Sequence, residues 1–145
     1  MKNSVHTGIF ISSDKKSVKA AEAAAIYIEL GWGTAKEYSV TRMKRSLANC
    51  DIVVSARNAG GELIGIARVL SDFATTTKIL DVLIVPEYQA QGIGARMMQK
   101  IASLAKGTDI YGETERKNFP FLTGCGYKKR KGLMVFMKKA KRIAP

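Results

Sequence analysis

The sequence predicts an α/β protein that is built on one mixed sheet. Residues 51–57 and 63–70 are both strand-like, and the turn-rich residues 58–62 between them are typical of a β-hairpin. A nearly continuous apolar run, residues 79–85, precedes a strong helical pattern and then another strand-like stretch, which is the order of a β-α-β unit. We expect the chain order β-α-α-β-β-β-α-β-α-β within one domain, residues 1–145.

The N-terminal third is expected to hold one strand and two helices. Residues 5–11 alternate loosely between apolar and polar side chains, as a short strand does, and residues 12–14 offer helix caps. Residues 16–30 are rich in alanine and predict an amphipathic helix. Its apolar face is predicted to consist of Val18, Ala21, Ala25 and Ile28.

Gly31 and Gly33 should end this helix. Val40, Met43 and Leu47 then recur at helical spacing with basic residues on the other side, which predicts a second, shorter helix.

The middle of the chain carries the central strands. After the hairpin and a polar turn at residues 72–77, the apolar run suits a strand, residues 78–85, that is covered on both faces. Pro86 should stop that strand, and residues 93–106 should form a helix that ends at Gly107. Residues 109–114 are then expected to pair in parallel with the previous strand.

The C-terminal part is expected to contain a short helix, residues 118–125, with Pro120 in its first turn. A last strand is predicted at residues 133–137.

The composition excludes several classes of protein. No apolar stretch reaches 18 residues and no signal peptide is recognisable, so we expect neither a membrane span nor secretion. Two distant cysteines and one histidine give no disulfide framework and no zinc-ligand pattern. We therefore expect a reduced, cytoplasmic protein without a metal.

The positive charge is concentrated at one end of the chain. The net charge is +12, but residues 116–145 carry ten basic and no acidic side chains, whereas residues 1–115 have a net charge of only +2. Such a segment is most often a solvated surface, and it can also attract an anionic cofactor or acceptor. Few aromatic residues are interleaved with the basic ones, so nucleic acid is a less favoured partner.

The turn between the apolar strand and the long helix, residues 86–95, can bind an anion. The first N–H groups of a helix have no intrahelical acceptor and lie at the positive end of the helix dipole, where a pyrophosphate can bind. Gly92 and Gly94 remove Cβ atoms that would block a close approach. The turn lacks the P-loop motif, and Met97 occupies the position that a dinucleotide-binding motif gives to a small residue.

The same turn resembles the acetyl-CoA-binding motif Q/R-x-x-G-x-G/A of the Gcn5-related N-acetyltransferases, here Gln89, Gly92 and Gly94 after a strand that ends in the V/I-x-P pattern, residues 84–86. Residues 118–127 are similar to the N-x-x-F-Y-x-x-x-G-F segment of that family. The resemblance extends over about residues 50–137 and implies a GNAT-like acyl-CoA N-acyltransferase fold, with a mixed, mostly antiparallel central sheet flanked by helices.

The resemblance implies an acetyl-CoA site. Backbone groups of the strand would pair with the pantetheine arm, one of their N–H groups would polarise the thioester carbonyl, and the turn would hold the pyrophosphate. Asn118 would reach the pantetheine near the thioester. The implied cofactor residues are Val82, Leu83, Ile84, Gln89, Ala90, Gln91, Gly92, Ile93, Gly94, Ala95 and Asn118.

The sequence offers several candidates for the catalytic acid and base. Leu122 stands where the family often has the tyrosine that protonates the leaving thiolate, so Tyr111 or Tyr127 is a candidate substitute. Asp81 lies within the apolar run, which makes it the candidate base that deprotonates the amine, with Glu113 and Glu115 in reserve. The alternative for Asp81 is a structural pair with a residue on a neighbouring strand, such as Arg68.

These features favour an N-acetyltransferase that moves an acetyl group from acetyl-CoA to a primary amine of a small molecule or peptide, by direct attack in a ternary complex. A non-catalytic acyl-CoA-binding or regulatory domain of the same fold is the alternative, and a basic nucleic-acid-binding module is a third. A homodimer is possible by the resemblance alone.

Overall fold

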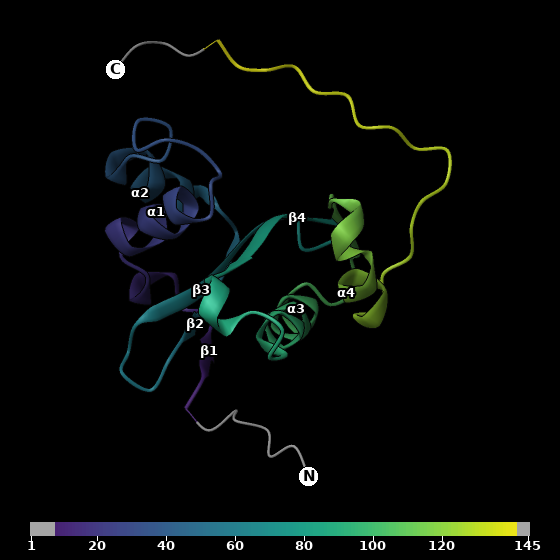
Figure 1. The fold of residues 1–145 in the computed structure, drawn as a ribbon. Helices are drawn as coiled ribbons and strands as arrows, with labels where there is room; N and C mark the ends of the chain where they lie inside the picture. Colours follow the sequence, from purple (N-terminus) through teal and green to yellow (C-terminus); the bar gives the residue numbers. More distant parts are fainter. Residues whose placement is uncertain (1–7, 142–145) are drawn as a thin grey trace.

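The computed structural model describes residues 8–141, and its strands form one five-stranded sheet in the order β1-β2-β3-β4-β5 (Figure 1). Strands β1 to β4 pair antiparallel with their neighbours, and β5 pairs in parallel with β4. The α/β fold, the hairpin and the β-α-β unit are thus confirmed. The strands are β1 (Phe10–Ser12), β2 (Ile52–Arg57), β3 (Leu63–Ser71), β4 (Thr76–Ile84) and β5 (Asp109–Gly112).

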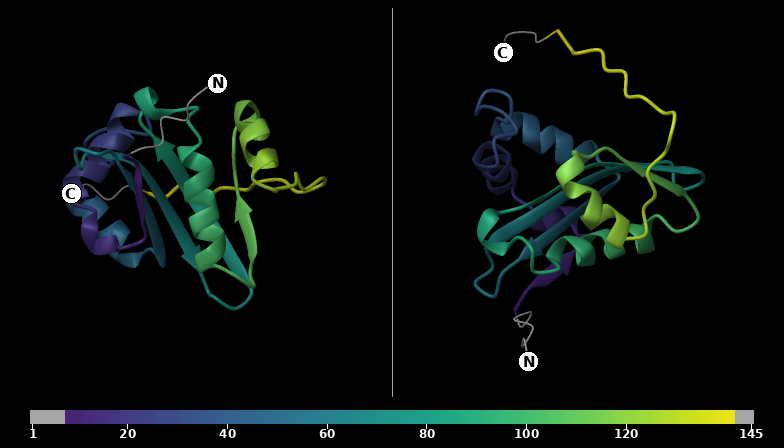
Figure 2. Two further views of the ribbon diagram at one scale, coloured as in Figure 1. Left: turned by 90° about the horizontal axis from the view of Figure 1, so that it is seen from below. Right: turned by 45° about the vertical axis from the view of Figure 1, so that its right-hand side comes forward.

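Helices cover both faces of this sheet (Figures 1 and 2). Helices α1 and α2 pack together on one face, and α3 packs on the other, mainly over β2 and β4. The short helix α4 lies beside the start of α3. The Phe121 ring of α4 is so close to Gly94 that a Cβ added there would lie 3.1 Å from it. The helices are α1 (Ala20–Glu29), α2 (Val40–Asn49), α3 (Ile93–Leu104) and α4 (Phe119–Gly124), with 3-10 turns η1 (Lys15–Ser17), η2 (Pro86–Tyr88) and η3 (Arg116–Asn118).

Helix α1 buries a different face from the predicted one. Ala21, Ala25 and Ile28 are exposed, and the buried face consists of Ala23, Ala24, Ile26 and Tyr27. Alanine occurs on every side of this helix, so counting apolar residues could not distinguish its faces. The one large aromatic side chain decides the orientation, because it buries the most surface.

A bidentate ion pair between Arg57 and Glu22 attaches helix α1 to the sheet. Arg57 of β2 donates to Glu22, with distances of 3.0 Å from Nη1 to Oε1 and 2.8 Å from Nη2 to Oε2. The hydrogen bond from Arg57 lowers the pKa of Glu22 below its ordinary value of 4.5, although burial opposes the shift. The carboxylate also accepts from the N–H of Lys19 at the helix start, which fixes the first turn of α1.

The N-terminal elements are shorter than predicted. Strand β1 covers only Phe10–Ser12, and residues 5–7 of the predicted strand lie outside the described residues. Asp14 caps the 3-10 turn η1 by accepting from the N–H of Lys16, and α1 begins only at Ala20.

Strand β4 contains a β-bulge that changes which side chains are buried. Asp81 pairs with Arg68 and Ile79 pairs with Val69, so Leu80 is an extra residue opposite β3. Side chains alternate along a strand, and the extra residue turns Asp81 toward the face of α1 and α2. The expectation that this strand is covered on both faces is wrong, because Leu80 is exposed and the side chains of Val82 and Ile84 are only half-buried.

The predicted last strand is also not formed. Residues 133–137 have no regular structure, and their side chains are between 64% and 88% exposed. A strand needs a partner for its backbone groups, and in the described part of the chain no segment pairs with these residues. Within residues 8–141, no helix has the length and apolar character that a membrane span requires.

Candidate active site

Strands β4 and β5 separate halfway along β4. Their parallel pairing runs from Thr76 and Asp109 to Ile79 and Gly112 and ends there, whereas β4 continues to Ile84. The bulge at Leu80 lies at this point of separation. One edge of the second half of β4 is therefore without a strand partner among the described residues, and its backbone groups are open to a ligand.

The register of β4 shows which groups face the open edge. Val85 donates its N–H to Ile64 of β3, so by alternation the N–H and C=O groups of Val82 and Ile84 point away from β3. The side-chain amide of Gln89 donates to the Ile84 carbonyl at 2.8 Å, so this glutamine binds the strand end. The backbone groups of Leu83 face Ile66 of β3 in this register, and its predicted contact with a pantetheine arm stays a prediction.

The turn after β4 directs the chain into the start of α3. The backbone of Ala90 has φ 58° and that of Gly92 has φ 79°, both in the left-handed region. Gly92 is the N-cap of α3, and the first bond within the helix runs from the N–H of Arg96 to the Gly92 carbonyl. The N–H groups of residues 93–95 therefore have no acceptor inside the helix, as an anion site requires.

The side chains of this turn have structural roles. The side chain of Ile93 is 1% exposed and belongs to the core, so only its backbone can take part in binding. The amide of Gln91 donates to the Glu87 carbonyl and closes the turn. The reason predicted for glycine at 94 needs correction, because the side on which a Cβ would stand is occupied by the Phe121 ring of α4.

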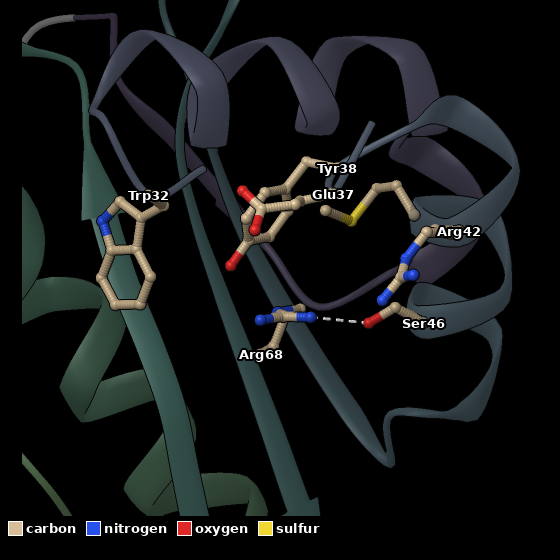
Figure 3. A pocket seen from close by; sticks show the side chains of 7 residues that line it. Trp32, Glu37, Tyr38, Arg42, Ser46 and Arg68 are labelled. Carbon is tan, nitrogen blue, oxygen red and sulfur yellow. Dashed lines mark hydrogen bonds between the residues drawn. The ribbon is translucent and has the colours of Figure 1, made fainter. Parts of the chain in front are cut away.

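A cavity of about 330 Å³ lies between the α1–α2 connection, α2 and β3 (Figure 3). In this view Trp32 and Arg42 stand at opposite ends, with Arg68 between them. Tyr27 stacks on Tyr38 at 4.8 Å between ring centroids and meets Trp32 edge-on at 6.1 Å. The cavity is lined by Trp32, Glu37, Tyr38, Arg42, Met43, Ser46 and Arg68.

A buried polar group connects this cavity to β4. Asp81 accepts from the Tyr27 hydroxyl at 2.6 Å on Oδ1, and from Arg68 at 2.6 Å (Nη2) and 3.0 Å (Nε) on Oδ2. Arg68 also donates to the Ser46 hydroxyl at 2.7 Å, and its guanidinium lies 4.8 Å from the centre of the Tyr27 ring. The three residues come from α1, β3 and β4, so the group joins α1 to the sheet.

The electrostatics of this group favour a fixed ion pair. Burial and the charge of Asp81 raise the pKa of the Tyr27 hydroxyl, so it stays protonated and donates. Burial by itself lowers the pKa of Arg68, but the hydrogen bonds to Asp81 outweigh that effect and the pKa rises. The Asp81 side chain is 1% exposed. The alternative interpretation of Asp81, a pair with Arg68, is confirmed, and its catalytic assignment stays a prediction.

The remaining candidates lie around the separated strands. Tyr111 is on β5 and is exposed, and Asn118 precedes α4 and is also exposed. Leu122 packs against the core, and the Tyr127 hydroxyl is buried without a hydrogen-bond partner within the described residues. Burial raises the pKa of Tyr127. Glu113 pairs with Lys78 and Glu115 with Lys117, both at the surface.

Tyr27, Tyr38 and Ser46 were not predicted as site residues. Each lies on or beside an N-terminal helix, where no motif marks it. The only signal in the sequence is that an aromatic residue at 27 must bury its ring and find a partner for its hydroxyl.

A match to a protein-family model shows the family to which this chain belongs. The family model described as "Acetyltransferase (GNAT) family" matches residues 22–120, more than half of the chain. The chain belongs to the GNAT acetyltransferase family. The matched region includes the cavity, the buried polar group and the whole turn into α3.

Individual relatives agree with this assignment. The chain is 35% identical over 75 residues to GCN5-related N-acetyltransferase 3, chloroplastic, of Arabidopsis thaliana, a match that covers 48% of this chain but only 30% of the plant protein. A GNAT acetyltransferase structure from Streptococcus pneumoniae TIGR4 superposes with a TM-score of 0.74 at 22% identity, covering 90% of this chain and 99% of that one. An aminoglycoside N-acetyltransferase in complex with CoA superposes with a TM-score of 0.69 at 13% identity, covering 91% and 95%.

Proposed function

We propose that this protein transfers an acetyl group from acetyl-CoA to a primary amine of a small molecule or peptide, by direct attack in a ternary complex. One observation carries the proposal. The open edge of β4 at Val82 and Ile84 leads through a left-handed glycine turn to the free N–H groups that begin α3. Membership of the GNAT family supports it, as does the CoA complex of a protein with the same fold.

Acetyl-CoA fits the residues present. The N–H and C=O of Val82 and the N–H of Ile84 can pair with the amides of a pantetheine arm, as a strand would. The N–H groups of residues 93–95 can bind the pyrophosphate at the positive end of α3. Asn118 at the start of α4 is the predicted contact to the pantetheine near the thioester.

The reaction needs a neutral amine and a stabilised carbonyl oxygen. The amine nitrogen attacks the thioester carbon, the new C–N bond forms, and the C–S bond breaks. A fixed N–H on the open edge of β4 stabilises the negative charge that develops on the carbonyl oxygen. The proton lost by the amine leaves through a base or water, and the thiolate takes up a proton to give free CoA.

We propose that the cavity of Figure 3 takes the acceptor, since it lies beside β3 and β4 on the face of α1 and α2. Asp81 is too enclosed to contact an acceptor there directly, and we assign it the role of positioning Arg68 and Tyr27 beneath the cavity. The prediction that it is also the base remains to be tested.

Leu122 keeps a second function in consideration. Its side chain has no proton to donate, Tyr111 is exposed on β5, and the Tyr127 hydroxyl is buried. A chain that binds acetyl-CoA without an acid for the leaving thiolate would be a sensor or regulatory domain. A CoA thiolate is a fairly good leaving group, so we favour catalysis.

Two measurements test the proposal together. Acetyl-CoA should raise the melting temperature, and release of free thiol should depend on an added amine, over a panel of polyamines, aminoglycosides, arylalkylamines and lysine peptides. If acetyl-CoA does not raise the melting temperature, both functions are wrong. Binding without thiol release from any amine would favour the regulatory domain.

We also propose that the protein works in a reducing compartment such as the cytoplasm. Both cysteines are free thiols in the structure, Cys50 buried and Cys125 half-buried. Mass spectrometry of the protein purified without reductant should find both as thiols.

A further inference from the structure

The shape of the acceptor cavity limits the size of the molecule that it can take. Its volume of about 330 Å³ is near the lower limit for small-molecule sites. A second hollow continues it along α2, and Arg42 and Ser46 line both. Arg45 and Asn49 complete this second hollow. The space therefore suits a small, elongated molecule better than the surface of a protein.

The two ends of the cavity differ in their surroundings. Trp32 lies at one end and meets the ring of Tyr27 edge-on at 6.1 Å, and the Tyr27 hydroxyl donates to Asp81 of β4 at 2.6 Å. Asp81 directly precedes Val82, which lies in the half of β4 with the open edge. Arg42 stands at the opposite end of the cavity (Figure 3). The reacting amine therefore belongs at the Trp32 end, and the rest of the acceptor extends toward Arg42.

The end at Arg42 is positively charged. Helix α2 carries Arg42, Lys44 and Arg45 and no acidic residue. Arg42 and Arg45 are exposed, and neither makes an ion pair with a residue that the structure describes. The charge of Arg68, by contrast, is compensated by Asp81. The two arginines of α2 therefore give this end of the cavity an excess of positive charge.

The negative charge at the cavity has a structural role. Among the described residues that line the cavity, only Glu37 carries a carboxylate. This carboxylate accepts from the N–H of Thr34 at 2.8 Å, and the Thr34 hydroxyl accepts from the N–H of Glu37 at 3.3 Å. The two reciprocal bonds close the turn between α1 and α2.

An anionic group on the acceptor would match the arginine end. The planar fork of an arginine can bind two oxygens of a carboxylate or a phosphate at once. We propose, on the basis of the transferase function proposed above, that the acceptor is a primary amine whose other end carries a carboxylate or a phosphate. Arg42 binds this anionic group, and Arg45 strengthens the positive field around it. The carbon chain between the two ends packs against the ring of Trp32.

Matched pairs of amines test this substrate class. ε-Aminocaproate and ε-aminocaproamide differ in the charge of the far group, and aminohexyl phosphate and aminohexanol differ by a phosphate. In thiol release from acetyl-CoA, kcat/KM should be about tenfold higher for the anionic member of at least one pair, as a charge-assisted hydrogen bond provides. The pair that shows the larger ratio identifies the group as a carboxylate or a phosphate. Equal values within both pairs would overturn the proposal.

The variant Arg42→Gln tests the residue. It should raise the KM for the anionic amine, so that kcat/KM falls about tenfold further for this amine than for its neutral counterpart. Lys44→Gln removes the same charge from the same helix at a residue that lines neither hollow, and it should leave both values unchanged. An equal loss for both members of the pair in Arg42→Gln would overturn the assignment, because it would show an effect that does not depend on the anion.

Calorimetry distinguishes a failure of this inference from a failure of the transferase function. ε-Aminocaproate and aminohexyl phosphate are titrated into the protein saturated with CoA. At least one should bind, and Arg42→Gln should weaken that binding about tenfold. If neither binds, the inference is wrong, although thiol release from other amines would still support the transferase. Binding that depends on Arg42, without thiol release from any amine, would support the anionic site and refute the transfer.

Discussion

The ion pair between Asp81 and Arg68 gives the sharpest test of how the buried polar group stabilises the fold. We would make Asp81→Asn, Arg68→Met and the double variant, and compare their free energies of unfolding. The Asp81 side chain is 1% exposed and that of Arg68 is 16% exposed, so neither charge is well solvated. Each single substitution leaves its former partner buried without a counter-charge.

The size of the effect follows from that burial. Breaking a buried ion pair by removing one partner costs about 3–5 kcal/mol, because an uncompensated charge remains. Asp81→Asn should lie near the lower limit, since the amide can still accept from the Tyr27 hydroxyl. The double variant removes both charges, so we expect it to recover roughly 2 kcal/mol relative to the sum of the single losses.

Urea denaturation and thermal melting measure these quantities. For a chain of this size, a loss of about 3 kcal/mol lowers the melting temperature by roughly 6–12 °C. Glu113→Gln is the control, because the ion pair of Glu113 with Lys78 is exposed and should be worth less than about 1 kcal/mol. Single losses that simply add in the double variant would refute the reasoning, since they would show that the two charges do not interact.

Three further predictions concern the cofactor turn, pH and the acceptor cavity. Gly92→Ala and Gly107→Ala each force alanine into a left-handed backbone, so each should lower the free energy of unfolding by roughly 1 kcal/mol. Only Gly92→Ala should also weaken acetyl-CoA binding, by about tenfold in calorimetry. The pKa of Glu22 is lowered, so its ion pair contributes fully to stability above about pH 4.5, and this contribution disappears as the pH falls through the folded-state pKa. The unfolding free energies of wild type and Glu22→Gln from urea titrations should therefore converge as the pH falls below 4.5, and a constant difference would contradict the assignment. Trp32→Ala should raise the KM for the acceptor at least fivefold without changing acetyl-CoA affinity, whereas Phe10→Ala, another exposed aromatic outside the cavity, should change neither.

The cofactor turn and the sheet that carries it could be predicted because their signals are local. A hairpin needs turn residues between two strands, and a left-handed N-cap favours glycine, so residues 58–62 and Gly92 indicate their own conformations. The strand, turn and helix that begin the β-α-β unit are consecutive in the chain, and chain order alone brings them together.

The face of α1 and the state of residues 133–137 could not be predicted in the same way. Alanine on all sides of α1 leaves its orientation to the sheet against which it packs. A sequence with high β-propensity shows only that a segment can form a strand. Whether it does so depends on an open strand edge elsewhere in the same molecule or in another one.

By itself, therefore, the sequence determined the order of the elements from β1 to α4, the glycine turn into α3 and the family that its motifs resemble. Only the tertiary structure decided that Asp81 meets Tyr27, 54 residues away in the chain, and Arg68 on the neighbouring strand. The reason is physical: one extra residue at Leu80 turns the carboxylate toward α1, and strand register and helix packing are properties of distant segments in contact.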